Sequence, residues 1–359
     1  MADDEPAAKR SRLSESAVAI YDEKRELVAV DAAQARTSDL FAPNMHLTGH
    51  GAAVYSLKFS PDGQHLASAS FDRRILLWNV YGEHCANYSM IEGHKNAVLE
   101  VHWSADGEEL VSCSADTMVS LWDAVVGTRL RKLQGHSAVV NSCCPSRKGA
   151  LLVASGGDDK VAKLWDARAK ACQATFRAEE AQAVTAVALS DDASQLFAGG
   201  IDNVVRVWDA RKGGEVLRTL AGHTHTITSL SLSPDGNHLL SNGMDNAVRC
   251  WDVRPFVAGD GGADGGGGGD GARCVKQFTG ASHNFEQTLL RCSWSADGAQ
   301  VGCGSSDRNA YVWDFDTATL MYQLPGHKGA VNEVAFHPKE PIVGSCSSDK
   351  TIFLGEVAA

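Results

Sequence analysis

Residues 66–79 read Leu-Ala-Ser-Ala-Ser-Phe-Asp-Arg-Arg-Ile-Leu-Leu-Trp-Asn, two short apolar runs joined by a polar turn. The aspartate of this turn stands six residues before a tryptophan, and the same spacing occurs six times along the chain. The pairs are Asp72 and Trp78, Asp116 and Trp122, Asp159 and Trp165, Asp202 and Trp208, Asp245 and Trp251, and Asp307 and Trp313. The tryptophans of the first five pairs follow one another at intervals of 43 or 44 residues. Such self-similarity predicts an array of equal structural units.

A histidine runs in phase with these two markers. It occurs in the pair Gly-His, with Ser282-His283 as a degraded copy, at His50, His94, His136, His223, His283 and His327. Where a tryptophan follows in the same unit, it stands 28 to 30 residues later. Projecting the spacings forward from His327 and Asp349 leads to Gly355-Glu356. The markers therefore predict a seventh unit that lacks the tryptophan.

Each unit contains short stretches typical of β-strands. In the first unit, residues 54–59, 66–70 and 74–78 are rich in apolar residues, and residues 60–63 read Ser-Pro-Asp-Gly, a turn sequence. A fourth strand precedes each Gly-His pair, as in residues 130–133. Units of four short strands that repeat every 43 residues predict an all-β fold, a seven-bladed β-propeller.

From about residue 42 to 357 the repeats resemble the WD40 family. In that family a His, a Ser or Thr, an Asp and a Trp form a hydrogen-bonded tetrad inside each blade, so the resemblance implies a structural role for these residues. The implied tetrads are His50, Ser68, Asp72 and Trp78; His94, Ser112, Asp116 and Trp122; His136, Ser155, Asp159 and Trp165; and His223, Ser241, Asp245 and Trp251. The other blades depart from the pattern: the fourth has no His and carries Ala198, the sixth carries Cys303, and the seventh has no Trp.

The two ends of the chain are predicted to meet in one blade. Residues 44–47 resemble an outer strand but follow no earlier blade, so we expect them to complete the seventh blade and remove its open edge. Residues 1–40 carry none of the markers and are predicted to be a mobile tail, in which Lys9-Arg10-Ser11-Arg12 fits a nuclear localisation signal. Residues 41–359 form the propeller, with a Gly-rich loop insertion at about residues 257–273.

Composition limits the classes of function. The formal net charge of −11 disfavours general nucleic-acid binding, so any RNA contact is expected to be local or made through a protein. The ten cysteines include no C-x-x-C pair, and no apolar run approaches the roughly 18 residues of a membrane span. A metal at the neighbouring Cys143 and Cys144 is the alternative, but no ligand stands at the required spacing. We predict no cofactor, no metal and no membrane contact.

The sequence contains no catalytic motif of the G-x-S-x-G, H-E-x-x-H or Walker type, so we predict a binding protein with no small-molecule substrate. In WD40 propellers the top-face loops commonly carry the contacts. The candidates beside the turn aspartates are Phe71, Arg73, Asp158, Ile201, Met244 and Arg308. Apolar residues flanked by arginines are typical of protein interfaces. The alternative for Phe71 is that it packs back on its own blade.

Several stretches outside the shared repeat pattern resemble the WD-repeat subunits of the spliceosomal U5 small nuclear ribonucleoprotein. They include residues 71–82, 244–256, 284–295, 324–338 and 348–356. This resemblance implies a nuclear, non-catalytic scaffold in pre-mRNA splicing, with the large central U5 scaffold protein and other spliceosomal proteins as partners.

Two alternatives belong to other classes of function. Residues 165–168, 208–211 and 251–254 each match the W-D-x-R box of cullin-4 ubiquitin ligase substrate receptors. A hydrolase on a propeller is the second alternative, and it would need a polar cluster that lines the central channel.

Overall fold

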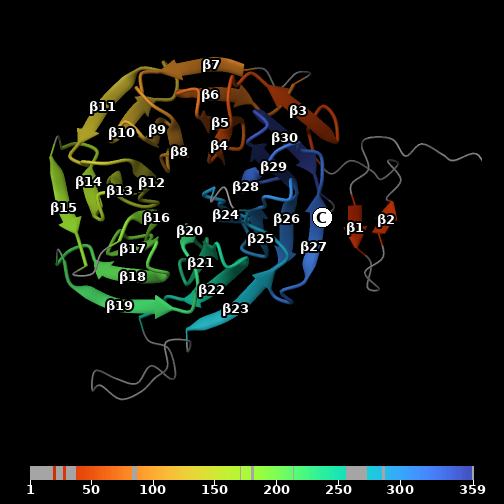
Figure 1. The fold of residues 1–359 in the computed structure, drawn as a ribbon. Coiled ribbons are helices and arrows are strands. Elements are labelled where there is room, and N and C mark those ends of the chain that lie inside the picture. Colours follow the sequence, from red (N-terminus) through yellow and green to blue (C-terminus); the bar gives the residue numbers. More distant parts are fainter. Residues whose placement is uncertain are drawn as a thin grey trace, which may run out of the picture.

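The computed structural model contains seven antiparallel sheets arranged as blades around a central axis (Figure 1). The structure describes residues 19–21, 27–29, 38–82, 87–169, 171–178, 182–212, 214–255, 273–284 and 288–357. Every regular element in these residues is a β-strand, and no helix among them is long and apolar enough to cross a membrane. The prediction of an all-β, seven-bladed propeller is therefore confirmed.

Six blades run from an inner to an outer strand in chain order. Blades one to three contain β4 (Val54–Phe59), β5 (His65–Ser70), β6 (Arg74–Asn79) and β7 (Asn87–Glu92); β8 (Val98–Trp103), β9 (Glu109–Ser114), β10 (Met118–Asp123) and β11 (Arg129–Gln134); and β12 (Val140–Pro145), β13 (Leu152–Gly157), β14 (Ala162–Asp166) and β15 (Cys172–Phe176). Blades four to six contain β16 (Val184–Leu189), β17 (Gln195–Gly200), β18 (Val204–Asp209) and β19 (Val216–Ala221); β20 (Ile227–Leu232), β21 (His238–Gly243), β22 (Ala247–Asp252) and β23 (Cys274–Thr279); and β24 (Cys292–Trp294), β25 (Gln300–Gly304), β26 (Ala310–Asp314) and β27 (Leu320–Leu324).

The strand directions define two faces of the ring. Neighbouring strands of a blade are antiparallel, so the turn between its second and third strands lies on the same face as the loop that leads from its outer strand to the next blade. We call this the top face, and the face with the remaining turns the bottom face. Seven clusters of buried apolar side chains fill the contacts between neighbouring blades. Each blade is thus stabilised by its two neighbours.

The top-face turn has the same strained backbone in every blade. Its third residue has a positive φ of 60° to 76°, and the seven residues are Arg73, Thr117, Lys160, Asn203, Asn246, Arg308 and Lys350. L-residues other than Asn and Asp rarely adopt this conformation. In the first blade the carboxylate of Asp72 holds the turn, because its Oδ1 accepts the N–H of Arg74 at 3.0 Å.

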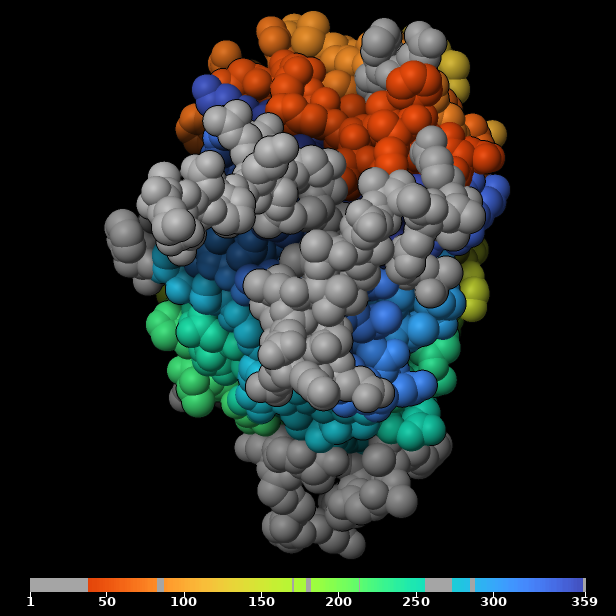
Figure 2. Space-filling view, turned by 90° about the vertical axis from the view of Figure 1, so that its right-hand side faces the viewer, coloured from red at the N-terminus to blue at the C-terminus, as the bar shows by residue number. Residues whose placement is uncertain are grey.

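The seventh blade combines both ends of the propeller. It contains β28 (Val331–Phe336), β29 (Ile342–Ser347), β30 (Thr351–Glu356) and, as its outer strand, β3 (Asn44–Thr48). Asn44 pairs with Gly355 and Thr48 with Thr351, so the predicted closure is confirmed. Figure 2 shows the consequence on the rim, where residues near the two ends of the propeller, coloured orange and blue, touch.

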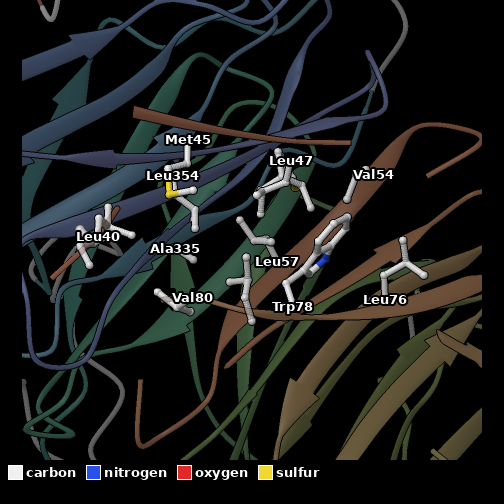
Figure 3. Close-up of a cluster of buried hydrophobic side chains, with 14 residues drawn as sticks. Leu40, Met45, Leu47, Val54, Leu57, Leu76, Trp78, Val80, Ala335 and Leu354 are labelled. Atoms are coloured by element: carbon white, nitrogen blue, oxygen red, sulfur yellow. The ribbon is translucent and has the colours of Figure 1, made fainter. Parts of the chain in front are cut away.

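The closing strand is also held by its side chains. Met45 and Leu47 are buried in one cluster with Leu354, Leu57 and Trp78, which belong to blades seven and one (Figure 3). At the bottom face the N–H of Ser38 donates to Glu356 at 2.6 Å and that of Asp39 donates to Glu340 at 3.0 Å. The closure therefore combines a β-ladder, an apolar cluster and two polar anchors.

Two short strands precede the propeller. β1 (Ala19–Tyr21) and β2 (Leu27–Ala29) pair with each other, and Ile20 of β1 pairs with Tyr322 on the outer edge of blade six. The rest of residues 1–37, for which a mobile tail is predicted, lies outside the described residues, as does nearly all of the predicted insertion at 257–273. The boundary at residue 40 and the extent of the insertion stay predictions.

Deleting residues 1–47 is expected to destabilise the whole ring. The deletion removes the buried Leu40, Met45 and Leu47 and opens the edge of β30. Burying one such side chain contributes about 1.5–3 kcal/mol, so the loss is on the order of 5 kcal/mol or more. Thermal unfolding followed by circular dichroism measures it, with a deletion of residues 1–37 as the control. Equal melting temperatures for the two deletions would contradict this role of β3.

Candidate protein-interaction site

The residues implied as a tetrad in blade one form a continuous chain of hydrogen bonds. The Nε1 of Trp78 donates to the Oγ of Ser68 at 2.9 Å, which lies 2.8 Å from the Nε2 of His50. The Nδ1 of His50 lies 2.9 Å from the Oδ2 of Asp72. Because the carboxylate of Asp72 only accepts, Nδ1 carries the proton, and in the neutral imidazole Nε2 then accepts the hydrogen bond that the serine hydroxyl donates. The chain runs from the blade interior to the top-face turn.

The same contacts recur in blades two, three and five. The distance from tryptophan to serine is 2.8, 2.7 and 2.7 Å, respectively. The distance from serine to histidine is 2.8, 2.7 and 2.6 Å, and that from histidine to aspartate is 3.0, 2.8 and 3.0 Å. The regularly spaced histidines are thus occupied in holding the top-face turns.

The pKa of the turn aspartate is lowered in blades one, two, five and seven. Burial alone would raise the pKa of Asp72, but the hydrogen bond from His50 and the backbone N–H of Gly51 outweigh it and lower the pKa to about 2. Asp116 and Asp349 reach a pKa of about 2 in the same way. Burial lowers the pKa of His136 and His327, which favours the neutral imidazole.

Blades four and six lack the complete tetrad, and their aspartates make other contacts. In blade four, with Ala198 in place of serine, the buried Nε1 of Trp208 has no hydrogen-bond partner in the described residues, and Asp202 pairs with Arg206. In blade six, Asp307 accepts a hydrogen bond from Tyr311. His283, aligned by spacing with the other histidines, lies 3.3 Å from Asn242 of blade five.

Blade seven replaces its missing tryptophan by a residue that spacing does not point to. Gly355 stands at the tryptophan position, but the ring of Phe353, two residues earlier, lies edge-on to His327 at 4.7 Å. The same phenylalanine stacks on His46 of the closing strand at 4.7 Å. Because His327 still contacts Ser345 at 2.9 Å and Asp349 at 3.1 Å, three members of the tetrad remain in place.

Opposite changes at the serine position should shift stability in opposite directions. Ser112→Ala removes the partner of both Trp122 and His94, and two unsatisfied buried groups are expected to lower the free energy of unfolding by about 3 kcal/mol. Ala198→Ser supplies an acceptor to Trp208 beside a cavity of about 20 Å³, and is expected to raise it by about 1 kcal/mol. Urea unfolding measures both. A stabilised S112A or a destabilised A198S would contradict the assigned hydrogen bonds.

Acid should weaken the fold through the tetrad aspartates. Because the folded-state pKa is depressed, their contribution is present above the unfolded pKa of about 4 and disappears as pH falls toward 2. Each of the three contributes about 2 kcal/mol at neutral pH. Urea unfolding between pH 7 and 2.5 measures the slope, and Asp116→Asn should flatten it. An unchanged slope in D116N would overturn this assignment.

The predicted contact residues all lie on the top face, spread over blades one, three, four, five and six. Phe71 and Ile201 are 56% and 51% exposed, and Arg73, Asp158 and Arg308 are exposed as well. Met244 is only partly exposed. The structure therefore places these residues around a ring rather than in one compact patch, and their role as contacts stays a prediction.

Phe71 is expected either to contact a partner or to pack back on its own blade, and its position allows both. Its ring packs edge-to-face on Tyr55 of its own blade, with the centroids 6.4 Å apart. More than half of its surface nevertheless faces solvent. An exposed aromatic ring supported from behind has lost part of its freedom before binding, which lowers the entropic cost of an interface.

The central channel contains a buried charged cluster that the sequence did not reveal. Arg291, before β24 in blade six, crosses to blade two, where its Nη1 lies 2.7 Å from the Oε1 of Glu100. Its Nη2 donates to the carbonyl of Asn141 in blade three at 3.2 Å. A second ion pair, Lys58 with Glu333, joins blades one and seven. Burial alone would raise the pKa of Glu100, but Arg291 outweighs it and keeps the carboxylate charged.

This cluster is better suited to holding the blades together than to catalysing a reaction. A cavity of about 520 Å³ opens beside it at the bottom face, lined in part by Lys58, Glu100 and His102. Each charged group of the cluster is already bound to another, since His102 lies 3.1 Å from Glu100 and the N–H of Leu57 donates to Glu333 at 2.7 Å. These contacts join blades one, two, six and seven across the channel.

The thiol of Cys143 has a neighbour that spacing did not show. Its Sγ, the Sγ of Cys113 and a carboxylate oxygen of Glu100 lie within 4.8 Å of one another, a grouping that could hold a metal ion. The carboxylate, however, already binds Arg291 and the N–H of Cys143. Burial also raises the pKa of Cys143, which disfavours the thiolate that a metal would need.

Comparison with known proteins gives the family. The WD domain, G-beta repeat family matches residues 41–79, 86–123, 127–166, 170–209, 214–252, 272–314 and 318–354. The human U5 small nuclear ribonucleoprotein 40 kDa protein is 53% identical over 322 residues, 90% of this chain and 86% of its own length. The chain belongs to this U5 40 kDa family of WD-repeat proteins. The Dictyostelium discoideum member is 50% identical, and the pre-mRNA-splicing factor cwf17 of Schizosaccharomyces pombe is 43% identical, each over 90% of this chain.

Membership in the U5 40 kDa family points to a non-catalytic scaffold connected with splicing, because its members are named as a ribonucleoprotein subunit or a splicing factor. The cullin-4 ligase alternative rests on the arginines of the three W-D-x-R boxes, which lie at bottom-face turns. Arg168 and Arg254 fold back on Asp166 and Asp252 of their own boxes, and Arg211 lies 3.4 Å from Asp192. The side chains of Arg168, Arg211 and Arg254 are nevertheless 75%, 71% and 54% exposed, so these surface contacts leave the ligase alternative untested.

Proposed function

We propose that this chain is a nuclear subunit of the U5 small nuclear ribonucleoprotein that uses its top face to hold the large central U5 scaffold protein during pre-mRNA splicing. The observation that carries the proposal is the 53% identity to the human U5 40 kDa protein over 90% of the chain. A similarity of this extent covers all seven blades, so the surfaces of the family member are expected to be shared.

The top face supports a protein partner. Phe71 and Ile201 are exposed aromatic and aliphatic side chains at the turns, and arginines lie at equivalent positions in blades one and six. Aromatic residues and arginine are enriched among residues that contribute most to protein binding. Because the tetrad of blade one fixes the turn that carries Phe71 and Arg73, little ordering of this turn is required when the partner arrives.

A double substitution tests the top face. Phe71→Ala with Arg73→Asn removes the exposed ring and one cation, and asparagine suits the positive φ of 72°, as at the equivalent Asn203. Truncation of such a hot spot is expected to weaken partner binding by about 2 kcal/mol or more, roughly thirtyfold, with little change in melting temperature. Affinity purification from nuclear extract, with U5 RNA and the large scaffold protein quantified, measures this loss.

The control is a matched pair of changes away from the top face. Val125→Ala with Lys132→Ala alters an exposed aliphatic residue and an exposed cation at the β10–β11 turn and on β11. We expect this variant to recover U5 RNA as the unchanged chain does. Recovery of a cullin adaptor without U5 RNA by the unchanged chain would overturn the proposed function, and a large drop in the melting temperature of the Phe71 variant would instead make that residue structural.

A further inference from the structure

The top face carries exposed cations that form no ion pair with a described residue, among them Lys160 and Arg177 of blade three. Five others follow one another around blades six, seven, one and two. They are Arg308 of blade six, Lys328 and Lys350 of blade seven, Arg73 of blade one and Lys95 of blade two, and we call them the basic arc. All five are exposed, and none forms an ion pair with another residue that the structure describes. The bottom-face arginines differ, since Arg168 and Arg254 each bind an aspartate.

The fold does not require the charges of the basic arc. Lys95 and Lys328 follow the tetrad histidine, and it is their backbone N–H groups that donate to Asp116 at 2.8 Å and Asp349 at 2.7 Å. Gly51 makes the same backbone contact in blade one without any side chain. A lysine at this position therefore adds an exposed charge and nothing that the turn needs.

Three other members of the arc occupy strained positions. Arg73, Arg308 and Lys350 have φ values of 72°, 76° and 76°. Blades four and five place Asn203 and Asn246 at the equivalent position, and asparagine tolerates this conformation better than arginine or lysine does. Long cations at these turns are thus unfavourable for the backbone, which fits selection for an interaction outside the fold.

The negative charges near the arc are engaged in contacts within the fold, and the exposed Glu92 at the top end of β7 pairs with Arg74. Asp72, Asp116 and Asp349 have side chains only 12%, 8% and 11% exposed, and they accept hydrogen bonds from histidine and from backbone N–H groups. Asp307 is exposed, but it accepts a hydrogen bond from Tyr311. The five cations are exposed and unpaired while most of these carboxylates are largely buried, so the local charge that a ligand meets is mainly positive.

We infer that the basic arc and Phe71 bind an acidic, extended segment of a partner protein. Its carboxylates lie along the cations of blades six, seven, one and two, and one of its apolar side chains packs on the exposed ring of Phe71. The inference rests on the proposed function, because it gives the chemistry of the partner on that same face. The tetrad carboxylates fix the turns, so the positive ends of the arc are presented without rearrangement.

An acidic peptide fits this surface better than RNA does. The net charge of −11 repels a long polyanion before contact, whereas a short segment with a few carboxylates experiences mainly the local arc. Single-stranded nucleic acid is bound by several aromatic stacking platforms along a basic groove. In the described part of blades six, seven, one and two, Phe71 is the one exposed aromatic ring among the top-face turns.

Fluorescence anisotropy of the full chain tests the inference with three labelled probes. The first is a 14-residue Gly- and Ser-based peptide with five glutamates and two central leucines, the second replaces every glutamate by glutamine, and the third is a 14-nucleotide oligouridine. We expect binding of the acidic peptide that weakens at least fivefold between 50 and 300 mM salt, and at least tenfold weaker binding of the other two probes. Equal binding of the acid and amide peptides, no binding of the acidic peptide, or tighter binding of the RNA would overturn the inference.

Charge reversal locates the site. Lys95→Glu with Lys328→Glu reverses two arc residues whose backbone contacts are retained, and we expect at least a tenfold loss of affinity for the acidic peptide. Lys132→Glu with Lys212→Glu makes the same change of net charge at two exposed lysines outside the arc, and its affinity should stay within twofold. Equal losses in the two variants would contradict a site at the arc, provided that circular dichroism shows equal melting temperatures.

The two proposals fail in different ways. If the acidic peptide does not bind but the Phe71 and Arg73 variant still loses U5 RNA, the acidic segment is wrong and the proposed function stands. If the peptide binds at the arc while the unchanged chain recovers no U5 RNA, the acidic ligand is correct and the U5 assignment is wrong.

Discussion

The pairing of β3 with β30 is the contact on which the other blade interfaces depend. Every blade is covered by two neighbours, so an open ring would expose one apolar face on blade one and another on blade seven. The five residues of β3 prevent this by joining the strand ladder of blade seven to an apolar cluster that reaches Leu57 and Trp78 of blade one. Tetrads can fix each turn, but only the closed ring fixes the turns relative to one another, which an interface spread over several blades requires.

The sequence predicted what depends on local, repeated chemistry. The spacing of Asp72 and Trp78 repeats because every blade uses the same turn, so the number of blades and the closing strand could be predicted. The strand bounds also followed closely, since the stretch expected at 54–59 is β4 itself. The same reasoning located the top-face side chains at Phe71 and Ile201, because their turn positions are copies of one another.

Contacts between distant blades could not be predicted in this way. Arg291 and Glu100 are 191 residues apart, occupy positions where blades one, three and five carry serine, and meet only because the ring brings blades six and two across one channel. Phe353 was missed for a related reason: it takes the place of a tryptophan from a different position in its strand. The basic arc likewise emerges only when blades six, seven, one and two are seen as neighbours, although its residues come from both ends of the sequence.

The closing strand also has a consequence for biosynthesis. β3 is the first strand of the propeller to leave the ribosome, but its partner β30 is made about 300 residues later. At ~5–20 residues per second, β3 waits roughly 15 to 60 seconds for its partner, with Met45 and Leu47 uncovered and its ladder edge open. During that interval the growing chain is an open ring of blades, and each of its two ends exposes apolar side chains and unpaired strand edges that could associate with other chains.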